Sequence, residues 1–254
     1  MQFSPAQIED LRVGLSEIGP KFSALQERIV VHGFRTEGAR EHADHGLARR
    51  LGTMARCIEQ TFELLPPDLA TIPERSTTLD ASINIQAFVM SAFGCCENMA
   101  WIWVHERDVR LPDSQPLPPA RVGLGANYPH VRAALTPSFR DYLDSRADWF
   151  AHLKDFRDAL AHRIPLFIPP YTVNTADVGQ YHALEAAANH ALRRHDFAGY
   201  ERLQADQMAL TRFQPIMAHS LLGGAGVVVF HYQLLADFGT IEEMAGVLFD
   251  ELGR

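Results

Sequence analysis

The chain has 254 residues, of which 47% are hydrophobic and 21% charged, and its formal net charge is −8 at pH 7. This composition is typical of a globular protein with a substantial core, and it excludes a disordered chain. The net negative charge argues against a broad nucleic-acid-binding surface, because such binding depends on cations that neutralise phosphates. Any nucleic-acid site must therefore be local.

The compartment is indicated by what the chain lacks. Its longest uncharged apolar run, residues 221–230, is about half the length that a bilayer crossing needs. The N-terminus has no basic segment followed by an apolar one, as a signal peptide would. The cysteines Cys57, Cys95 and Cys96 are odd in number and lie in helical patterns, which fits buried, reduced thiols. We therefore expect a cytoplasmic protein without a membrane segment.

The N-terminal part of the chain has the pattern of helices. Ser4 followed by proline is a favourable helix start, and Gly19-Pro20 is expected to break this first helix. A second helix is then expected over 21–32 and a third over 38–65. Three prolines make the following segment, 66–78, a loop.

The clearest helix is expected to open at Asp80. Its apolar residues repeat at alternating spacings of four and three, which places it in the middle of a bundle: Ile85, Val89, Ala92, Cys96, Met99 and Trp103. Residues 109–136 hold five prolines and two glycines, so we expect a long irregular connection. Thr136 followed by proline predicts the N-cap of a helix that ends at His162, shortly before Pro165.

The next part of the chain alternates between extended and helical patterns. Residues 164–170 are apolar but too rich in proline for a central strand. Residues 179–194 and 197–210 predict a helical hairpin with its turn at His195-Asp196. Residues 213–221 are expected to form a short extended piece.

Two closing helices are expected over 227–238 and 240–252. Thr240 and Glu243 match a capping box at the start of the second one. Strand patterns are weak throughout and no internal repeat is present. The sequence therefore predicts an all-α (mainly α) fold in which residues 1–254 form a single, mainly helical unit.

The helix that ends at His162 carries a charged motif. Arg157 and His162 have four residues between them, and Asp158 directly follows the arginine. At about 100° per residue, Asp158 and His162 fall opposite the apolar stripe of this helix, and Arg157 falls at its border. Core packing therefore does not explain these residues. Because Asp158 and His162 are an i, i+4 pair, we expect the carboxylate to hold the imidazole. The stripe consists of Trp149, Leu153, Phe156 and Leu160.

An arginine, a polar residue and then a histidine at the end of a bundle helix resembles the motif of the HEPN superfamily, named for nucleotide binding in higher eukaryotes and prokaryotes. In that family two such helices usually meet across a dimer, and many members cut RNA without a metal. The resemblance covers about residues 80–163. It implies a HEPN-like helical bundle and a homodimer without cofactors. The C-terminal part lies outside the resemblance, and from its helical patterns we expect a helical extension over about 175–254.

The activity implied by this resemblance is that of a metal-independent ribonuclease of the toxin or phage-defence kind. His162 would act as general acid and base, since a histidine pKa near 6.5 suits proton transfer at a ribose hydroxyl. Arg157 would stabilise charge on the phosphoryl oxygens, and Asp158 would orient His162. Lys154 and Arg163 would add a local positive rim for RNA. A neutralising protein partner is a further possibility that this class of activity implies.

Two alternatives use the same residues. The first is a non-catalytic helical bundle that binds a nucleotide-like ligand or a partner protein through the same face. The second is purely structural, since Arg157 and His162 near a helix C-terminus can meet the negative end of the dipole, worth about 0.3–1 kcal/mol.

Other polar patterns are weaker. Glu41 and His45 are one helical turn apart, as in some bundle metal sites, but the chain contains no Glu-x-x-His unit, so we expect a solvated face and no bound metal. The glycine-rich segment 222–226 lacks the Lys-Ser/Thr of a phosphate loop, and a turn is expected. Glu97 and Asn98 are expected to form buried hydrogen bonds to another helix. No histidine can be assigned to a cysteine nucleophile.

Overall fold

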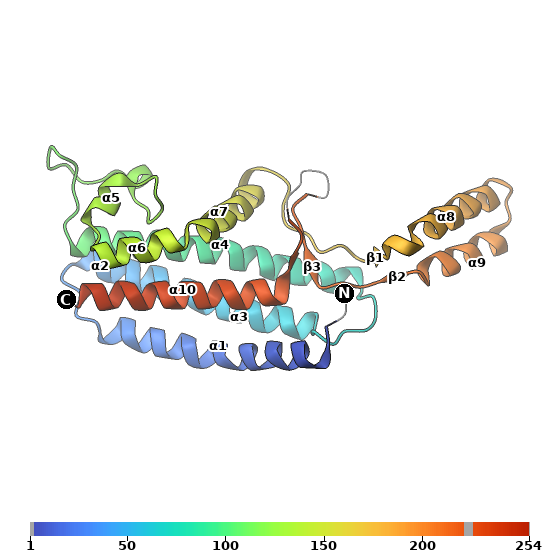
Figure 1. The fold of residues 1–254 in the computed structure, drawn as a ribbon, viewed down its shortest axis with the longest axis horizontal. Coiled ribbons are helices and arrows are strands. Elements are labelled where there is room, and N and C mark those ends of the chain that lie inside the picture. The colour runs from blue at the N-terminus through green and yellow to red at the C-terminus, as the bar shows by residue number, and fades with distance from the viewer. Residues whose placement is uncertain (1–2, 221–225, 254) are drawn as a thin grey trace.

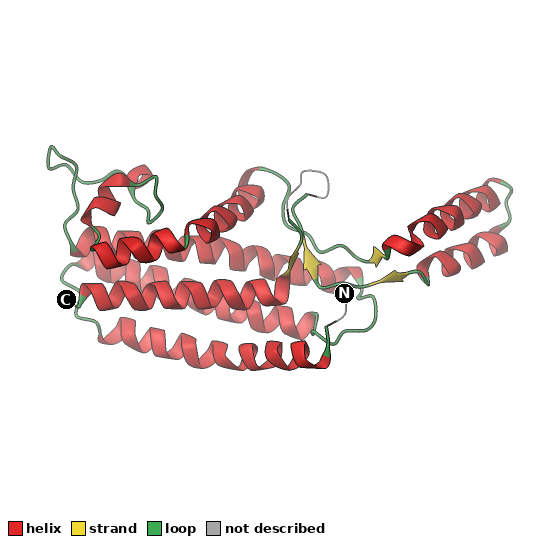
Figure 2. Ribbon diagram, in the orientation of Figure 1, coloured by secondary structure: helices red, strands yellow, loops and turns green. Residues whose placement is uncertain are grey.

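The computed structural model describes residues 3–220 and 226–253 and is 71% helical, which confirms the all-α class (Figure 1). Figure 2 shows that the strands of the described ranges are short and lie where the chain leaves and re-enters the bundle. The α-helices are α1 (Pro5–Val31), α2 (Glu37–Glu41), α3 (Ala48–Leu64), α4 (Arg75–Glu106), α5 (Pro129–Ala134), α6 (Pro137–Ser145), α7 (Ala147–His162), α8 (Val178–Arg193), α9 (Phe197–Met208) and α10 (Phe230–Leu252).

Helices α1, α3, α4 and α10 lie side by side as an elongated bundle, and α7 packs on α4 (Figure 1). Along α4 the predicted stripe is buried as expected, together with Phe88. By length and composition α4 could cross a membrane, but 67% of its most apolar stretch is buried inside the protein. A helix that is apolar on most sides belongs at the centre of a bundle, so core packing accounts for this composition.

The predicted break at Gly19-Pro20 is wrong, because α1 continues through Pro20 to Val31. A proline inside a helix removes one backbone hydrogen bond and normally bends or ends the helix. Here Ile18 and Leu25, on either side of the proline, are both buried against the bundle. Packing on both sides of Pro20 therefore overrides the local signal.

The predicted cap at Thr240 is also wrong, because α10 is continuous from Phe230 to Leu252. The Thr240 hydroxyl donates a hydrogen bond of 2.9 Å to the carbonyl of Ala236, one turn back in the same helix. Phe238 and Ile241 beside it are fully buried, which fixes the helix across this point. Local capping residues do not end a helix whose neighbours lie in the core.

The helix predicted between Thr136 and His162 is two helices. The Thr136 hydroxyl accepts a hydrogen bond of 3.2 Å from the backbone of Phe139, as expected for an N-cap, and α7 ends at His162 as predicted. The chain turns at Arg146, between α6 and α7. This turn lets Arg146 pair with Glu243 of α10 at 2.8 Å.

The predicted helix over 38–65 contains a π-helical segment, His42–Leu47, between α2 and α3. Near this wider turn, Asn98 of α4 bonds the His42 ring at 3.2 Å and accepts from Nε of Arg50 at 3.0 Å. A Cβ on Gly46 would lie 2.4 Å from the Asn98 amide, so only glycine allows this approach. The expected hydrogen bonding of Asn98 to another helix is confirmed.

Helices α8 and α9 form the predicted hairpin, which projects from one end of the bundle (Figure 1). Its turn is at His195, which has a φ of 60°. The base of the hairpin is a two-stranded antiparallel sheet of β1 (Thr172–Val173) and β2 (Thr211–Arg212). Closer to the bundle, β3 (Ile216–Met217) pairs with β4 (Val228–Val229). We call α8, α9 and the turn between them the arm. The expected turn over 222–226 lies almost wholly outside the described residues.

Candidate functional site

Arg157 is held between α7 and α4. Its guanidinium carbon lies 4.2 Å from the centre of the Phe93 ring, which is a cation–π contact between the two helices. Its Nη1 pairs with Asp158 at 3.1 Å, and its side chain is 26% exposed. Its Nε is buried without a hydrogen-bond partner among the described residues. The arginine is therefore positioned by packing while at least one of its donors is unused.

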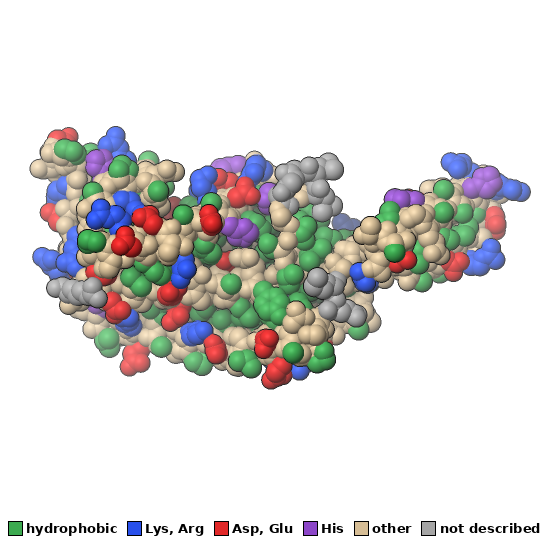
Figure 3. Space-filling view, viewed as in Figure 1, with side chains coloured by type: hydrophobic (Ala, Val, Ile, Leu, Met, Phe, Trp, Pro, Cys, Tyr) green, Lys and Arg blue, Asp and Glu red, His purple; other side chains and the backbone are tan. Residues whose placement is uncertain are grey.

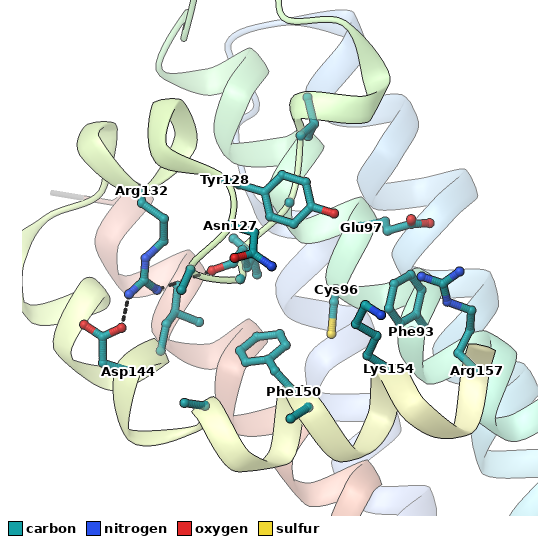
Figure 4. A pocket seen from close by; sticks show the side chains of 18 residues that line it. Phe93, Cys96, Glu97, Asn127, Tyr128, Arg132, Asp144, Phe150, Lys154 and Arg157 are labelled. Atoms are coloured by element: carbon teal, nitrogen blue, oxygen red, sulfur yellow. Dashed lines mark hydrogen bonds and ion pairs between the residues drawn. The ribbon is translucent and has the colours of Figure 1, made fainter. Parts of the chain in front are cut away.

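A cavity of about 310 Å³ adjoins Arg157. Its walls come from α4, from the irregular segment 122–128 and from α5, α6 and α7, and most of its lining is apolar (Figure 4). Lys154, Glu97 and Arg157 lie towards one end, whereas the ion pair of Arg132 and Asp144 lies towards the other. The aromatic residues of the lining are Phe93, Tyr128 and Phe150.

Tyr128 depends on a glycine for its position at the cavity. A Cβ on Gly123 would lie 2.4 Å from the Tyr128 ring, closer than side chains approach each other. Only glycine therefore allows the ring to fold back onto its own loop. Gly123 and Tyr128 together shape the side of the cavity that faces α4 and α7.

Cys96 contributes apolar surface to the cavity and not a nucleophile. The side chain is buried in the central helix, and Figure 4 shows its sulfur at the wall. Burial raises the pKa of the Cys96 thiol well above its ordinary value, so the thiol stays protonated. Cys96 is therefore part of the apolar wall of the cavity.

Asp158 does not form the predicted pair with His162 among the described residues. Its carboxylate instead accepts a hydrogen bond of 2.6 Å from Lys154, one turn back, and contacts Arg157. The hydrogen bond from Lys154, more than any other interaction, lowers the pKa of Asp158. Two permanently charged neighbours thus replace the expected imidazole, and the predicted role of Asp158 as orienter of His162 is not supported.

His162 is exposed at the last residue of α7. It follows Arg157 by five positions, which corresponds to a turn of roughly 140° and a rise of about 7.5 Å. Arg157 faces the cavity and Phe93, so His162 lies on a different side of the helix. Within one chain the structure brings Lys154, Arg157 and Asp158 together and leaves His162 apart.

Arg163 does not join this cluster. It donates to the Asp155 carboxylate at 2.5 Å, and the buried His219 ring bonds the same carboxylate at 3.0 Å. The hydrogen bond from Arg163 is the main cause that lowers the pKa of Asp155. Asp155 therefore ties the end of α7 to the segment after β3, and Arg163 takes part in this contact.

The described residues hold no group of three or more His, Cys, Asp or Glu side chains arranged to bind a metal. His42 stacks on Trp101 with ring centres 5.4 Å apart, and His45 bonds Arg49 at 3.1 Å. Glu97, expected to bond another helix, is exposed at the rim of the cavity instead.

Sequence reasoning identifies Arg157 as a candidate site residue because it lies at the border of the apolar stripe of its helix. It misses Asn127 and Tyr128, because they come from a segment without periodicity. The nearest signal was the pair of glycines in that segment, which indicates close backbone approach.

No protein-family model, no curated protein and no solved structure matches the chain. The fold and the cavity alone define the class of protein: a helical bundle with a pocket of about 310 Å³ and a projecting helical arm.

Proposed function

We propose that the protein binds a small anionic ligand with a planar ring, of nucleotide-like chemistry, in the cavity between α4 and α7. One observation carries this proposal: Arg157 lies over Phe93 at the edge of the cavity, with its buried Nε unpartnered among the described residues. The cavity volume of about 310 Å³ is at the lower end of the range for small-molecule sites.

The lining suits both halves of such a ligand. A planar ring can stack on Tyr128 or Phe150, whose rings line the cavity (Figure 4). The Asn127 amide and the Glu97 carboxylate can bond the donors and acceptors at the edge of a base. Together these groups would recognise the ring.

The phosphate would lie at the end of the cavity where Arg157 and Lys154 are found. Asp158 occupies Nη1 of Arg157 and Nζ of Lys154, and the 60% exposed Lys154 also faces water. A guanidinium carries five donor hydrogens and an ammonium three, so both groups retain donors after binding one carboxylate. A phosphate can therefore contact both cations without displacing Asp158.

The test is calorimetric titration with AMP, GMP, UMP, adenosine and inorganic phosphate. We expect at least one nucleotide to bind more tightly than adenosine or phosphate alone. Arg157→Ala should weaken that binding about 10- to 100-fold, as expected for a hydrogen bond to a charged group. Arg163→Ala is the matched control, since Arg163 is tied to Asp155, and it should leave affinity unchanged. Absence of binding, or equal effects of the two variants, would contradict the proposal.

A second candidate is the metal-independent ribonuclease, of the toxin or phage-defence kind. The exposure of His162, one helical turn beyond Asp158, favours it, because a long RNA chain can reach an exposed histidine. His162 would take the proton of a 2′-hydroxyl while Arg157 stabilises the phosphoryl charge. Since the two side chains leave α7 in different directions, a second copy would have to supply the complementary residue, as in an isologous dimer. A neutralising partner would cover the same face.

The ribonuclease is tested on a mixed RNA pool in the presence of EDTA, reading the products for 2′,3′-cyclic phosphate ends. His162→Ala should lower cleavage roughly 10²- to 10⁴-fold, the range for general acid-base groups. His182→Ala, which changes an exposed histidine of the arm, serves as control, and thermal melts verify folding. If the wild type leaves RNA intact while it binds a nucleotide, the ribonuclease is excluded and the binding function stands.

A further inference from the structure

The arm has almost no core of its own. Inside it the buried residues are small or polar: Ala188, Ala191, Gly199 and Gln207. Isolated helices of this length are marginal in water and depend on burying an apolar face. The packing inside the arm is therefore limited, and some of its apolar side chains remain exposed.

Four large apolar side chains of the arm are exposed, at 39% to 59%, and they form two pairs. Leu192 at the end of α8 and Phe197 at the start of α9 lie at the tip. Val178 at the start of α8 and Met208 at the end of α9 lie at the base. An apolar pair thus lies at each end of the arm.

All four lie on one face of the arm. Val178 and Leu192 are 14 positions apart, which leaves them about 40° from each other around α8, and Phe197 and Met208 lie within about 20° around α9. We compare the direction of each exposed pair with the direction of the buried residues of the same helix. In both helices the exposed pair is rotated about the helix axis by roughly a quarter to a third of a turn from the buried residues, in the same rotational sense. In an antiparallel pair of helices, equal offsets point to the same face.

We infer that this face docks on the same face of a second copy of the chain, with the two arms antiparallel. The bundle joins the arm at its base, so antiparallel arms keep the two bundles at opposite ends (Figure 1). In the resulting isologous contact Val178 meets Leu192 of the second copy, and Phe197 meets Met208 of the second copy. Each exposed apolar side chain then finds an apolar partner.

The charges of the arm complement this arrangement. Arg193 and Arg194 lie at the tip, and Figure 3 shows basic side chains and histidines gathered there. Asp177 lies at the base, where the tip of the second copy would reach. Glu185, midway along α8, would approach its own copy near the symmetry axis and weaken the contact.

The expected dimer is weak because the face is small. A 16-residue helix is about 24 Å long, and two helices side by side are about 20 Å wide, which gives roughly 500 Å² on each copy. Stable interfaces bury about 800 Å² on each partner, so we expect a dissociation constant in the micromolar range.

Sedimentation of the full-length protein over roughly 1 to 100 μM tests the inference. The wild type should shift from monomer to dimer, and Phe197→Glu and Met208→Glu should each raise the dissociation constant at least tenfold. Val30→Glu, at an exposed apolar position of α1, should not. Glu185→Gln should tighten the dimer, and the exchange Arg193→Asp with Asp177→Arg should recover part of what either change loses. A wild type that stays monomeric, or equal effects of all three glutamate variants, overturns the inference.

Disulfide formation tests the orientation. Val178 and Leu192 are about 21 Å apart along α8, too far for a disulfide within one arm. A chain with both Val178→Cys and Leu192→Cys should therefore form disulfide-linked dimers on oxidation, and neither single variant should. The native cysteines Cys57, Cys95 and Cys96 are buried and do not compete. Crosslinking through Leu192→Cys alone would place the tips together and contradict the antiparallel arrangement.

Discussion

The bundle and the arm are both helical, but they differ in what their helices bury. The bundle holds fully buried aromatic side chains, among them Phe88, Trp103 and Phe238, whereas the buried positions of the arm are small or polar. The free energy that holds a helix in place comes mainly from such packing. The bundle should therefore unfold as one cooperative unit, while the arm opens locally at lower free energy.

The largest expected effect is the loss of a core aromatic. Phe88→Ala in α4 should lower the free energy of unfolding by about 3–5 kcal/mol, because it removes buried apolar surface and leaves a cavity. Phe197→Ala in the arm, where the side chain is 59% exposed, should change it by less than about 0.5 kcal/mol. Urea unfolding at low protein concentration measures both. Equal effects would remove the distinction between the two regions.

A buried histidine should lower the stability of the bundle in acid, in opposition to a buried aspartate of the same helix. Burial lowers the pKa of His231 in α10 to about 4, below its ordinary value, and its Nε2 bonds the carbonyl of Leu65 at 2.7 Å. Because the unfolded state binds a proton first, the contribution of His231 to stability falls as the pH drops from about 6.5 to about 4, by roughly 3 kcal/mol. His231→Gln should remove this contribution, so in urea unfolding at several pH values the variant should lose stability as the pH rises from about 4 to about 6, through the opposing titration of Asp237. A variant with the same pH profile as the wild type would mean that His231 makes no such contribution.

Asp237, on the same helix, should act in the opposite direction. Burial raises its pKa to about 6, although Trp149 and Gln233 donate hydrogen bonds to it at 2.8 and 2.7 Å. The folded state therefore keeps a proton that the unfolded state loses, and the stability present below about pH 4 is lost as the pH rises through about 6, by roughly 3 kcal/mol. Since His231 and Asp237 oppose each other, the wild type should show a flat profile over this range.

Asp237→Asn should make the contribution of His231 to the pH dependence of stability visible, because it removes the group that titrates in the opposite direction. Stability of this variant should rise steadily between about pH 4 and pH 6.5, whereas the wild type changes little. The same urea measurements test it, with Asp148→Asn, at an exposed position of α7, as control. A variant profile as flat as that of the wild type would show that the two groups do not compensate.

A small effect is expected where the bundle meets the segment that leads to the arm. Asp155→Ala removes the contacts with Arg163 and His219, and since the carboxylate is 49% exposed we expect a loss of at most about 1 kcal/mol. Amide hydrogen exchange at the last turn of α7 should quicken while the exchange of α4 stays unchanged. Equal acceleration in α4 would place Asp155 in the cooperative unit instead.

Much of the fold could be predicted from the sequence because the pattern and the packing agree. The stripe of α4, the cap at Thr136 and the hairpin turn at His195 all follow from local periodicity and chemistry. The errors at Pro20 and Thr240 share one cause: buried neighbours keep the helix continuous against a local stop signal. Local signals cannot reveal how strongly the rest of the chain holds a helix.

The candidate site was only partly predictable. Arg157 could be found because it interrupts an apolar pattern without fitting the core. Its partners Phe93 and Tyr128 could not, since one looks like an ordinary core residue and the other comes from an irregular loop. Asp158 has Lys154 one turn before it and His162 one turn after it, and its carboxylate bonds Lys154. An ammonium is a cation at neutral pH, whereas an imidazole is mostly neutral, so the ammonium is the stronger partner for a carboxylate.

The short sheet at the base of the arm brings the two ends of the arm together, so the length of the arm can change without moving the bundle. Val173 lies directly opposite Thr211 in the antiparallel pair, so the polypeptide leaves for the arm and returns at almost the same point. A two-residue turn such as Asn-Gly spans that gap in ordinary hairpins. In topological terms the arm is an insertion: it can be excised, lengthened or exchanged between genes while the path of the bundle stays the same.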